Sequence, residues 1–268
     1  MSRPDWEITR GSSPILATAI HNGNLVRADL KKRMILADAS RLREEDPYTG
    51  RWTAIAENRI ILNTSRFEVD LNRPREKAVY ARPEDAWGLN IWDQDLEQEV
   101  VDLSLTKYDR FYRELKTILD ELQAQFGRFV VYDIHSYNHR RNGADAPPEP
   151  QEANPEVNLG TGTLDKSRWG QVAEAFMDTI RDFDYNGRHL DVRENIKFKG
   201  GFLSTWIHEN YPETGCCLAV EFKKFFMDEW TGEYFEDDMV RVEEALKATV
   251  APVSKAANRQ TSGGLTNS

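Results

Sequence analysis

The chain has 268 residues, of which 40% are hydrophobic and 30% charged, and its formal net charge is −10. This composition is typical of a globular protein with a sizeable core. The negative charge argues against a nucleic-acid partner, but it does not exclude a small anionic substrate, which responds to local charge. No apolar run approaches the length of a membrane span, and residues 1–6 lack the apolar segment of a signal peptide. We therefore expect a protein that binds neither nucleic acid nor a membrane.

The two cysteines, Cys216 and Cys217, are adjacent and lie within an apolar run. They cannot build a disulfide framework, so we expect a cytoplasmic protein. Both thiols are predicted to be buried as small hydrophobic side chains. Neither has a base beside it in the sequence, which argues against a cysteine nucleophile.

Apolar and polar segments alternate in the N-terminal part of the chain. An apolar run over 15–20 predicts the first core strand, which ends at His21 and a glycine-bearing turn. The other segments predicted here are a polar, peripheral stretch (1–13), a helix (26–37), a charged loop that leads into a short helix (41–49) and a strand (60–62).

The middle of the chain holds the longest helical pattern and the central strand. Apolar residues keep helical spacing over 105–126, which predicts a long amphipathic helix. The apolar run 129–132 then predicts a buried strand that stops at the sequence Asp-Ile-His-Ser (133–136). Upstream, residues 65–74 end in a turn fixed by proline. Residues 75–98, rich in tryptophan, proline and charge, are expected to cover one side of a functional site.

The C-terminal half continues the alternation. Its predicted segments are a mobile loop able to serve as a lid (142–154), a strand and turn (156–163), three helices (168–183, 202–210 and 239–257), two strands (190–195 and 216–222) and a disordered tail from residue 258. Strands that alternate with helices predict one three-layer α/β domain over residues 1–268, built around a mixed, largely parallel sheet. Residues 1–13 and 258–268 are expected to be peripheral or disordered.

Four polar features fall at the predicted ends of apolar strands: His21, Asp70–Arg73, Asp133–His135 and Glu221. Binding and catalysis gather at such ends in α/β sheets. Two neutral imidazoles and a carboxylate make a zinc site with a position left for water. A further carboxylate can transfer protons, a guanidinium can hold an anionic group, and an aspartate beside a histidine can orient a metal-binding ring. Each feature alone is explained more simply as a turn or an ion pair, but their recurrence in one sheet predicts metal-assisted amide hydrolysis.

Five segments follow one another in a recognisable order: residues 19–23, 67–74, 133–136, 195–201 and 220–224. Over residues 15–230 the chain resembles the N-formylglutamate amidohydrolase family, which is related in fold to zinc carboxypeptidases and aspartoacylases. The resemblance implies a zinc-carboxypeptidase-like fold. It also implies zinc-dependent cleavage of a small N-acyl, formyl-type amide of an amino acid such as N-formylglutamate.

The resemblance assigns roles to individual residues. It implies that His21 and His135 bind zinc and that Glu221 is the general base and acid. Arg73 would contact the substrate carboxylate or carbonyl, with Asn72 beside it. The other substrate-binding candidates are basic or amide side chains near these segments: Arg66, His139, Arg140 and Asn195.

The third metal ligand is left open by the sequence. In carboxypeptidase-like sites it is a glutamate three residues after the first histidine, but Asn24 stands at that position. Glu45 and Asp46 are the candidates and Glu44 is a third choice, while an acidic helix cap is the alternative interpretation of all three. Ile20 also differs from the proline that the family commonly has before the first histidine.

Two other functions are compatible with the sequence. The loop 142–154 and the segment Trp87–Trp92 suit a wide cleft, which favours a metallopeptidase or amidase acting on a larger peptide or cell-wall substrate. The substitution at Asn24 instead favours a non-catalytic protein that binds a small anionic ligand. The acyl group, the amino acid and the oligomeric state stay open.

Overall fold

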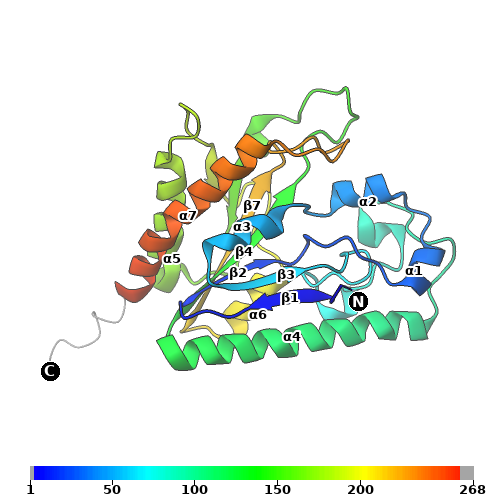
Figure 1. The fold of residues 1–268 in the computed structure, drawn as a ribbon, viewed down its shortest axis with the longest axis horizontal. Helices are drawn as coiled ribbons and strands as arrows, with labels where there is room; N and C mark the ends of the chain where they lie inside the picture. Colours follow the sequence, from blue (N-terminus) through cyan, green and yellow to red (C-terminus); the bar gives the residue numbers. More distant parts are fainter. Residues whose placement is uncertain (1–2, 260–268) are drawn as a thin grey trace.

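A single mixed sheet of seven strands forms the centre of the computed structural model, which describes residues 3–259 (Figure 1). The strands stand in the order β1-β3-β2-β4-β7-β5-β6. Strands β3, β2, β4 and β7 run parallel, as do β5 and β6, whereas β1 is antiparallel to β3 and β5 to β7. The strands are β1 (Trp6–Thr9), β2 (Ile15–Ala19), β3 (Asn58–Leu62), β4 (Phe129–Tyr137), β5 (Val157–Gly160), β6 (Val192–Glu194) and β7 (Gly215–Lys223).

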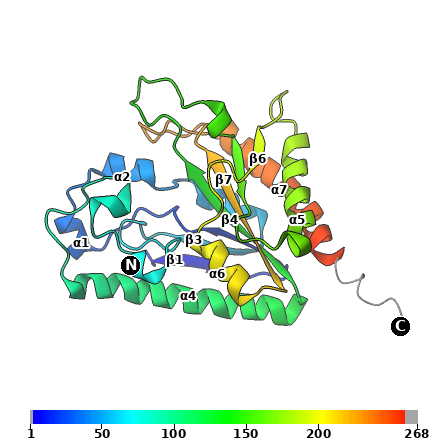
Figure 2. The same cartoon turned by 180° about the vertical axis from the view of Figure 1, so that it is seen from behind.

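Helices cover both faces of this sheet. In both views α4 and α6 lie on one side, and α5 and α7 lie on the other (Figures 1 and 2). The helices are α1 (Ala28–Arg33), α2 (Asp38–Glu44), α3 (Thr49–Trp52), α4 (Gln98–Phe126), α5 (Lys166–Asp182), α6 (Phe202–Asn210) and α7 (Glu236–Arg259), with short 3-10 turns at Thr53–Ile55, Arg75–Lys77, Pro83–Ala86 and Gln151–Ala153. None of the helices within residues 3–259 is long and apolar enough to cross a membrane. The predicted three-layer α/β fold is confirmed.

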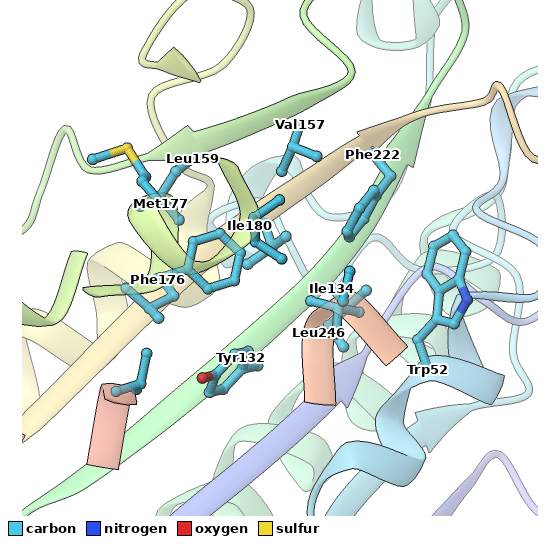
Figure 3. Close-up of a cluster of buried hydrophobic side chains, with 14 of the residues drawn as sticks. Trp52, Tyr132, Ile134, Val157, Leu159, Phe176, Met177, Ile180, Phe222 and Leu246 are labelled. Carbon is cyan, nitrogen blue, oxygen red and sulfur yellow. The ribbon is translucent and has the colours of Figure 1, made fainter. Parts of the chain in front are cut away.

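Alternate residues of the central strands feed two separate hydrophobic cores, because successive side chains of a strand point to opposite faces. Tyr132 and Ile134 face α5 and α7 and pack against Phe176 and Leu246 (Figure 3), whereas Val131 joins the core under α4 and α6. The two cysteines divide in the same way. Cys216 lies in the first core and Cys217 in the second, and both are free and buried, as predicted.

Helix α4 begins seven residues before the predicted start at 105. Its first turns are held by polar contacts, since Arg27 donates to the buried Ser104 hydroxyl (2.6 Å) and to the Val100 carbonyl. An apolar periodicity cannot reveal a segment anchored in this way. The helix ends at Gly127, whose φ of 74° lies in the left-handed region that glycine adopts without strain.

The central strand is longer than predicted. It continues through the Asp133-to-Ser136 sequence to Tyr137, and all nine of its residues are buried. The prediction that the strand stops at Tyr132 is wrong because the polar residues beyond it are paired inside the protein. His135 therefore lies within the strand, paired with Glu221 of β7.

Several other boundaries differ from the prediction. Within the segment 1–13, Trp6–Thr9 form the edge strand β1, which pairs with β3 and has three exposed residues. The predicted helix over 26–37 is reduced to α1, since Met34 leaves it to bridge Trp92. Asn258 and Arg259, which were predicted to belong to a disordered tail, are the last residues of α7, and the rest of that predicted tail (260–268) lies outside the described residues.

His208 of α6 ties that helix to the sheet and makes stability depend on pH. The Cys217 amide donates to His208 Nε2 (3.0 Å), and Nδ1 lies 2.9 Å from the Thr163 hydroxyl. Burial lowers the pKa of His208 from 6.5 to about 4. Between pH 6.5 and 4 the imidazole is protonated in the unfolded chain but neutral in the folded chain. The contribution of His208 to the free energy of unfolding is therefore complete above pH 6.5 and is lost as the pH falls towards 4.

The free energy of unfolding falls between pH 7 and pH 4.5, and we expect this fall to be smaller by roughly 2 kcal/mol in His208→Gln than in the wild type. Urea unfolding of both proteins at the two pH values measures the difference. His189→Gln, a change at an exposed histidine, should leave the pH dependence of the wild type intact. An equal loss in wild type and His208→Gln would contradict the assignment.

Candidate active site

A cavity of about 240 Å³ opens where β2, β4 and β7 end, and the strand-end residues of the sequence line it. His21 follows β2, His135 lies in β4, and Glu221 lies in β7 directly opposite His135 in the parallel ladder. These strands are neighbours in the sheet, which is why residues 200 positions apart in the sequence meet. The carboxyl ends of parallel strands form the site, as predicted.

Two histidines and one aspartate converge at the floor of this cavity. Asp46 Oδ2 lies 3.0 Å from His135 Nδ1 and 3.4 Å from His21 Nδ1. One ligand atom from each residue lies within 4.8 Å of those of the other two, and all three residues are buried. Two imidazoles and a carboxylate in this arrangement could hold a metal ion.

Each histidine ring is oriented by a second carboxylate. Asp70 Oδ1 lies 2.7 Å from His21 Nε2, and Asp133 Oδ2 lies 3.0 Å from His135 Nε2. Asp133 can reach His135 because residues i and i+2 of a strand share a face, and its other oxygen accepts from the Thr18 hydroxyl (2.9 Å). Both rings consequently turn Nδ1 towards Asp46, as carboxylate–histidine–metal arrangements require.

Asp70 is the most connected carboxylate of the site. It accepts hydrogen bonds from Arg66 (2.9 Å), from the Asn72 amide (2.8 Å) and from the Tyr80 hydroxyl. Burial acts to raise the pKa of Asp70, but Arg66 and His21 hold it well below its usual range. Asp70 is thus a fixed negative charge behind His21.

Three carboxylates, those of Asp46, Asp70 and Asp133, surround the two histidines. Burial opposes ionisation of Asp46, yet His135 and His21 hold its pKa well below the usual range. Burial lowers the pKa of His135, but Asp133 and Asp46 together raise it far above normal. Burial, aided by the charges of Asp46 and Asp133, raises the pKa of Glu221 to about 8. A divalent cation at the three donors would balance these carboxylates, so the residues present fit a metal.

The structure separates the three acidic residues that the sequence left as alternatives. Asp46 is turned to the histidines, and its amide donates to the His21 carbonyl (2.9 Å). Glu45 points elsewhere, because its carboxylate accepts from Arg41 (2.9 Å) and from Ser65. Glu44 lines the cavity but lies outside the cluster.

The sequence profile of the N-formylglutamate amidohydrolase family matches residues 13–226. The chain belongs to this family. The match covers most of the described structure, including every residue of the cluster. It confirms the resemblance found in the sequence, and the family is one of hydrolases that act on amide bonds.

Two solved structures share the fold of this family member. The N-formylglutamate amidohydrolase from Ralstonia eutropha JMP134 superimposes with a TM-score of 0.72 and 16% identity over 95% of this chain and 98% of that one. The gene product Atu2144 from Agrobacterium tumefaciens gives a TM-score of 0.64 and 16% identity over 92% and 95%. At this identity the likeness concerns the fold. No match is found among curated protein sequences.

Arg73 and Asn72 of this family member lie in the cavity wall, where the resemblance placed them. Arg73 is loosely held, with one bond to the Asp85 carbonyl (3.2 Å) and Nε 3.7 Å from Asp70. Asn72 Nδ2 lies 3.5 Å from His135 Nε2. A Cβ on Gly201 would approach the Asn72 amide to 2.2 Å, which explains a glycine there.

Arg66 also lines the cavity, but its guanidinium already has protein partners. It is bound to Asp70 and lies over the Trp87 ring, 4.9 Å from the centroid. The structure therefore gives Arg66 the role of holding Asp70. The Trp87 ring forms part of the cavity wall, as the sequence allowed.

Three of the predicted substrate-binding residues do not line the cavity. The backbone amides of His139 and Arg140 both donate to the buried Glu229, and neither residue lines the cavity. The Asn195 side chain bonds the amide and hydroxyl of Thr161, and its own backbone is left-handed with φ of 57°. These residues shape loops, and a local polar pattern could not distinguish that role from binding.

Two cavity residues were missed or given less weight. Arg141 lines the cavity next to Glu44, with Nη2 3.5 Å from the carboxylate, whereas the histidine and arginine before it do not. Lys224 is buried three residues after Glu221 and also lines the cavity. A lysine directly after an apolar strand that carries a candidate base was the available signal.

Proposed function

We propose that this chain is a zinc-dependent amidohydrolase that removes a small acyl group, formyl in the first instance, from an acidic amino acid such as glutamate. The observation that carries the proposal is the buried cluster of His21, Asp46 and His135 with Glu221 opposite His135. Membership of the N-formylglutamate amidohydrolase family supports the substrate class.

His21, Asp46 and His135 would hold the metal through Nδ1, Oδ2 and Nδ1. A zinc ion there would polarise the amide carbonyl and lower the pKa of a water molecule. Asp70 and Asp133 keep the two rings in the required orientation.

Glu221 is the proton carrier of the proposed reaction. Glu221 lines the cavity, and within residues 3–259 its carboxylate has no hydrogen-bond or ion-pair partner. Burial raises the pKa of Glu221, which makes its carboxylate a better proton acceptor than an exposed glutamate. The carboxylate takes a proton as the water oxygen attacks the amide carbon. It returns that proton to the amino nitrogen as the carbon–nitrogen bond breaks, which yields the free acid and the amino acid.

Arg73 anchors a substrate carboxylate. It is part-exposed to the cavity, and its protein contacts use Nε and one hydrogen of Nη2, so Nη1 and the second hydrogen of Nη2 can donate to a carboxylate. N-Formylglutamate carries two carboxylates, and Arg141 supplies a second cation in the wall.

The cavity size favours a small substrate. About 240 Å³ lies at or below the lower end of ordinary ligand pockets, which run from roughly 300 Å³ upwards. A peptide or cell-wall fragment would need a longer groove. The complete set of histidines, aspartate and glutamate argues equally against a protein that only binds.

Release of formate from N-formylglutamate by protein purified without chelator tests the proposal. N-Formylglutamine, which lacks the side-chain charge, should be a poorer substrate. We expect Arg73→Met to raise KM about 100-fold, the loss of one charge-assisted contact, with a smaller effect on kcat. Arg140→Met, a change at an arginine outside the cavity, should keep the wild-type KM. No formate release in the presence of zinc, or a preference for formylated peptides, would contradict the proposal.

A further inference from the structure

Lys224 is the most deeply buried charged group beside the cavity without a charged partner. It directly follows β7 and is 1% exposed. Its ammonium donates to the carbonyls of Arg43 (2.6 Å) and Glu45 (2.8 Å). Among residues 3–259 the ammonium forms no ion pair. A buried charge that is satisfied by neutral carbonyls needs a structural or chemical reason.

The two carbonyls belong to the end of α2. Helix ends leave their last carbonyls without partners, and a positive charge is favourable there. Residue 45 is the C-cap of α2, and its carbonyl is part of the peptide group that carries the Asp46 amide. Lys224 therefore binds the carbonyl oxygen of the peptide group that joins Glu45 to Asp46.

The same peptide group is held from its other side. The Asp46 amide donates to the His21 carbonyl at 2.9 Å. The Glu45–Asp46 peptide is thus fixed at its oxygen by Lys224 and at its nitrogen by the backbone of a second member of the cluster. Fixing this plane sets the direction in which the Asp46 side chain leaves the backbone.

Lys224 is itself held by the sheet. Its amide donates to the Tyr137 carbonyl (3.0 Å), which extends the pairing of β7 with β4 by one residue. The backbone of Lys224 is consequently held at the end of the paired strands β4 and β7, which carry His135 and Glu221. The ammonium links these strands to the loop that carries Asp46.

We infer that Lys224 is a positioning residue of the metal site, which clamps the Glu45–Asp46 peptide so that Asp46 stays between the two histidines. The inference rests on the proposed function, because it takes His21, Asp46 and His135 to be metal ligands. The effect of Lys224 on catalysis is then exerted through Asp46.

The neighbouring lysine provides a matched control. Lys223 is also largely buried, but its ammonium bonds the Asn154 carbonyl (3.2 Å) and the Gln151 side chain, in a segment away from α2. Replacement of either lysine by methionine removes one buried ammonium and two hydrogen bonds. Only Lys224→Met frees the Glu45–Asp46 peptide.

Zinc affinity measured by competition with a chromophoric chelator tests the inference without any assay of activity. We expect Lys224→Met to weaken zinc binding by about 10- to 100-fold, as loss of an outer-shell contact does. Lys223→Met should keep the wild-type affinity, although both variants lower the melting temperature. At saturating zinc, Lys224→Met should retain the wild-type KM. Lys224→Gln, which keeps a hydrogen-bond donor but not the charge, should bind zinc with intermediate affinity. If Lys224→Met does not fold, Lys224→Gln is compared with Lys223→Met instead.

Two results would overturn the inference. One is wild-type zinc affinity in a folded Lys224 variant, and the other is a raised KM at saturating zinc with unchanged zinc affinity, which would place the ammonium on the substrate. Failure of the wild type to bind zinc is a separate result, and it would count against the proposed function itself.

Discussion

Replacement of Glu221 by glutamine should abolish turnover while zinc stays bound. Glutamine has the shape of glutamate but cannot accept the proton of the attacking water, and loss of a general base costs roughly 100- to 10,000-fold in rate. The residue contributes no atom to the cluster of His21, Asp46 and His135, so the donors remain in place. We expect kcat for formate release to fall about 1,000-fold, with one zinc per chain by elemental analysis.

A matched control is Glu68→Gln. Glu68 is also a buried carboxylate, but it accepts from the Arg27 backbone amide, pairs with Lys107 and does not line the cavity. Its replacement should lower the melting temperature and leave kcat unchanged. Near-normal activity of Glu221→Gln would show that another group transfers the proton.

Asp46→Asn should lose zinc, whereas Glu45→Gln should keep it. The two carboxylates are adjacent in sequence, but only Asp46 lies between the histidine nitrogens. An amide oxygen is a poor zinc ligand, and loss of a direct ligand exceeds the 10- to 100-fold cost of an outer contact. We therefore expect at least a 100-fold weaker zinc affinity for Asp46→Asn in chelator competition.

Glu45→Gln disturbs the same loop without touching the donors. It weakens the pairing of Glu45 with Arg41 and Ser65, so it should reduce thermal stability. Equal zinc affinity of Asp46→Asn and the wild type would overturn the ligand assignment. Loss of zinc from Glu45→Gln alone would transfer that role to Glu45.

The sequence located the histidines of the site because each follows or continues an apolar run. His21 ends the first strand, and His135 stands two residues after Asp133 on a strand, where spacing alone brings the two side chains to one face. The same reasoning placed Glu221 at the end of a third strand. Parallel strands then brought these ends together, which is a property of the fold class.

The choice between Glu45 and Asp46 could not be made in the same way. Both follow a seven-residue helix, and their side chains are directed by groups distant in sequence: Ser65 donates to the Glu45 carboxylate, and the Asp46 amide donates to the His21 carbonyl. The position of the candidate binding residues outside the cavity has a similar origin. The His139 amide donates to Glu229, which lies 90 residues further along the chain, and the Arg140 amide donates to the same carboxylate. No local sequence pattern shows these contacts.

The two adjacent cysteines can report separately on the two hydrophobic cores, one on each face of the sheet. Cys216 and Cys217 are neighbours in the chain, but the α5–α7 layer covers the first and the α4–α6 layer the second. Burial raises the pKa of both thiols, so neither reacts with an alkylating reagent until its own layer opens. Single-cysteine variants would therefore report, from one point on β7, which side of the sheet opens first and how often.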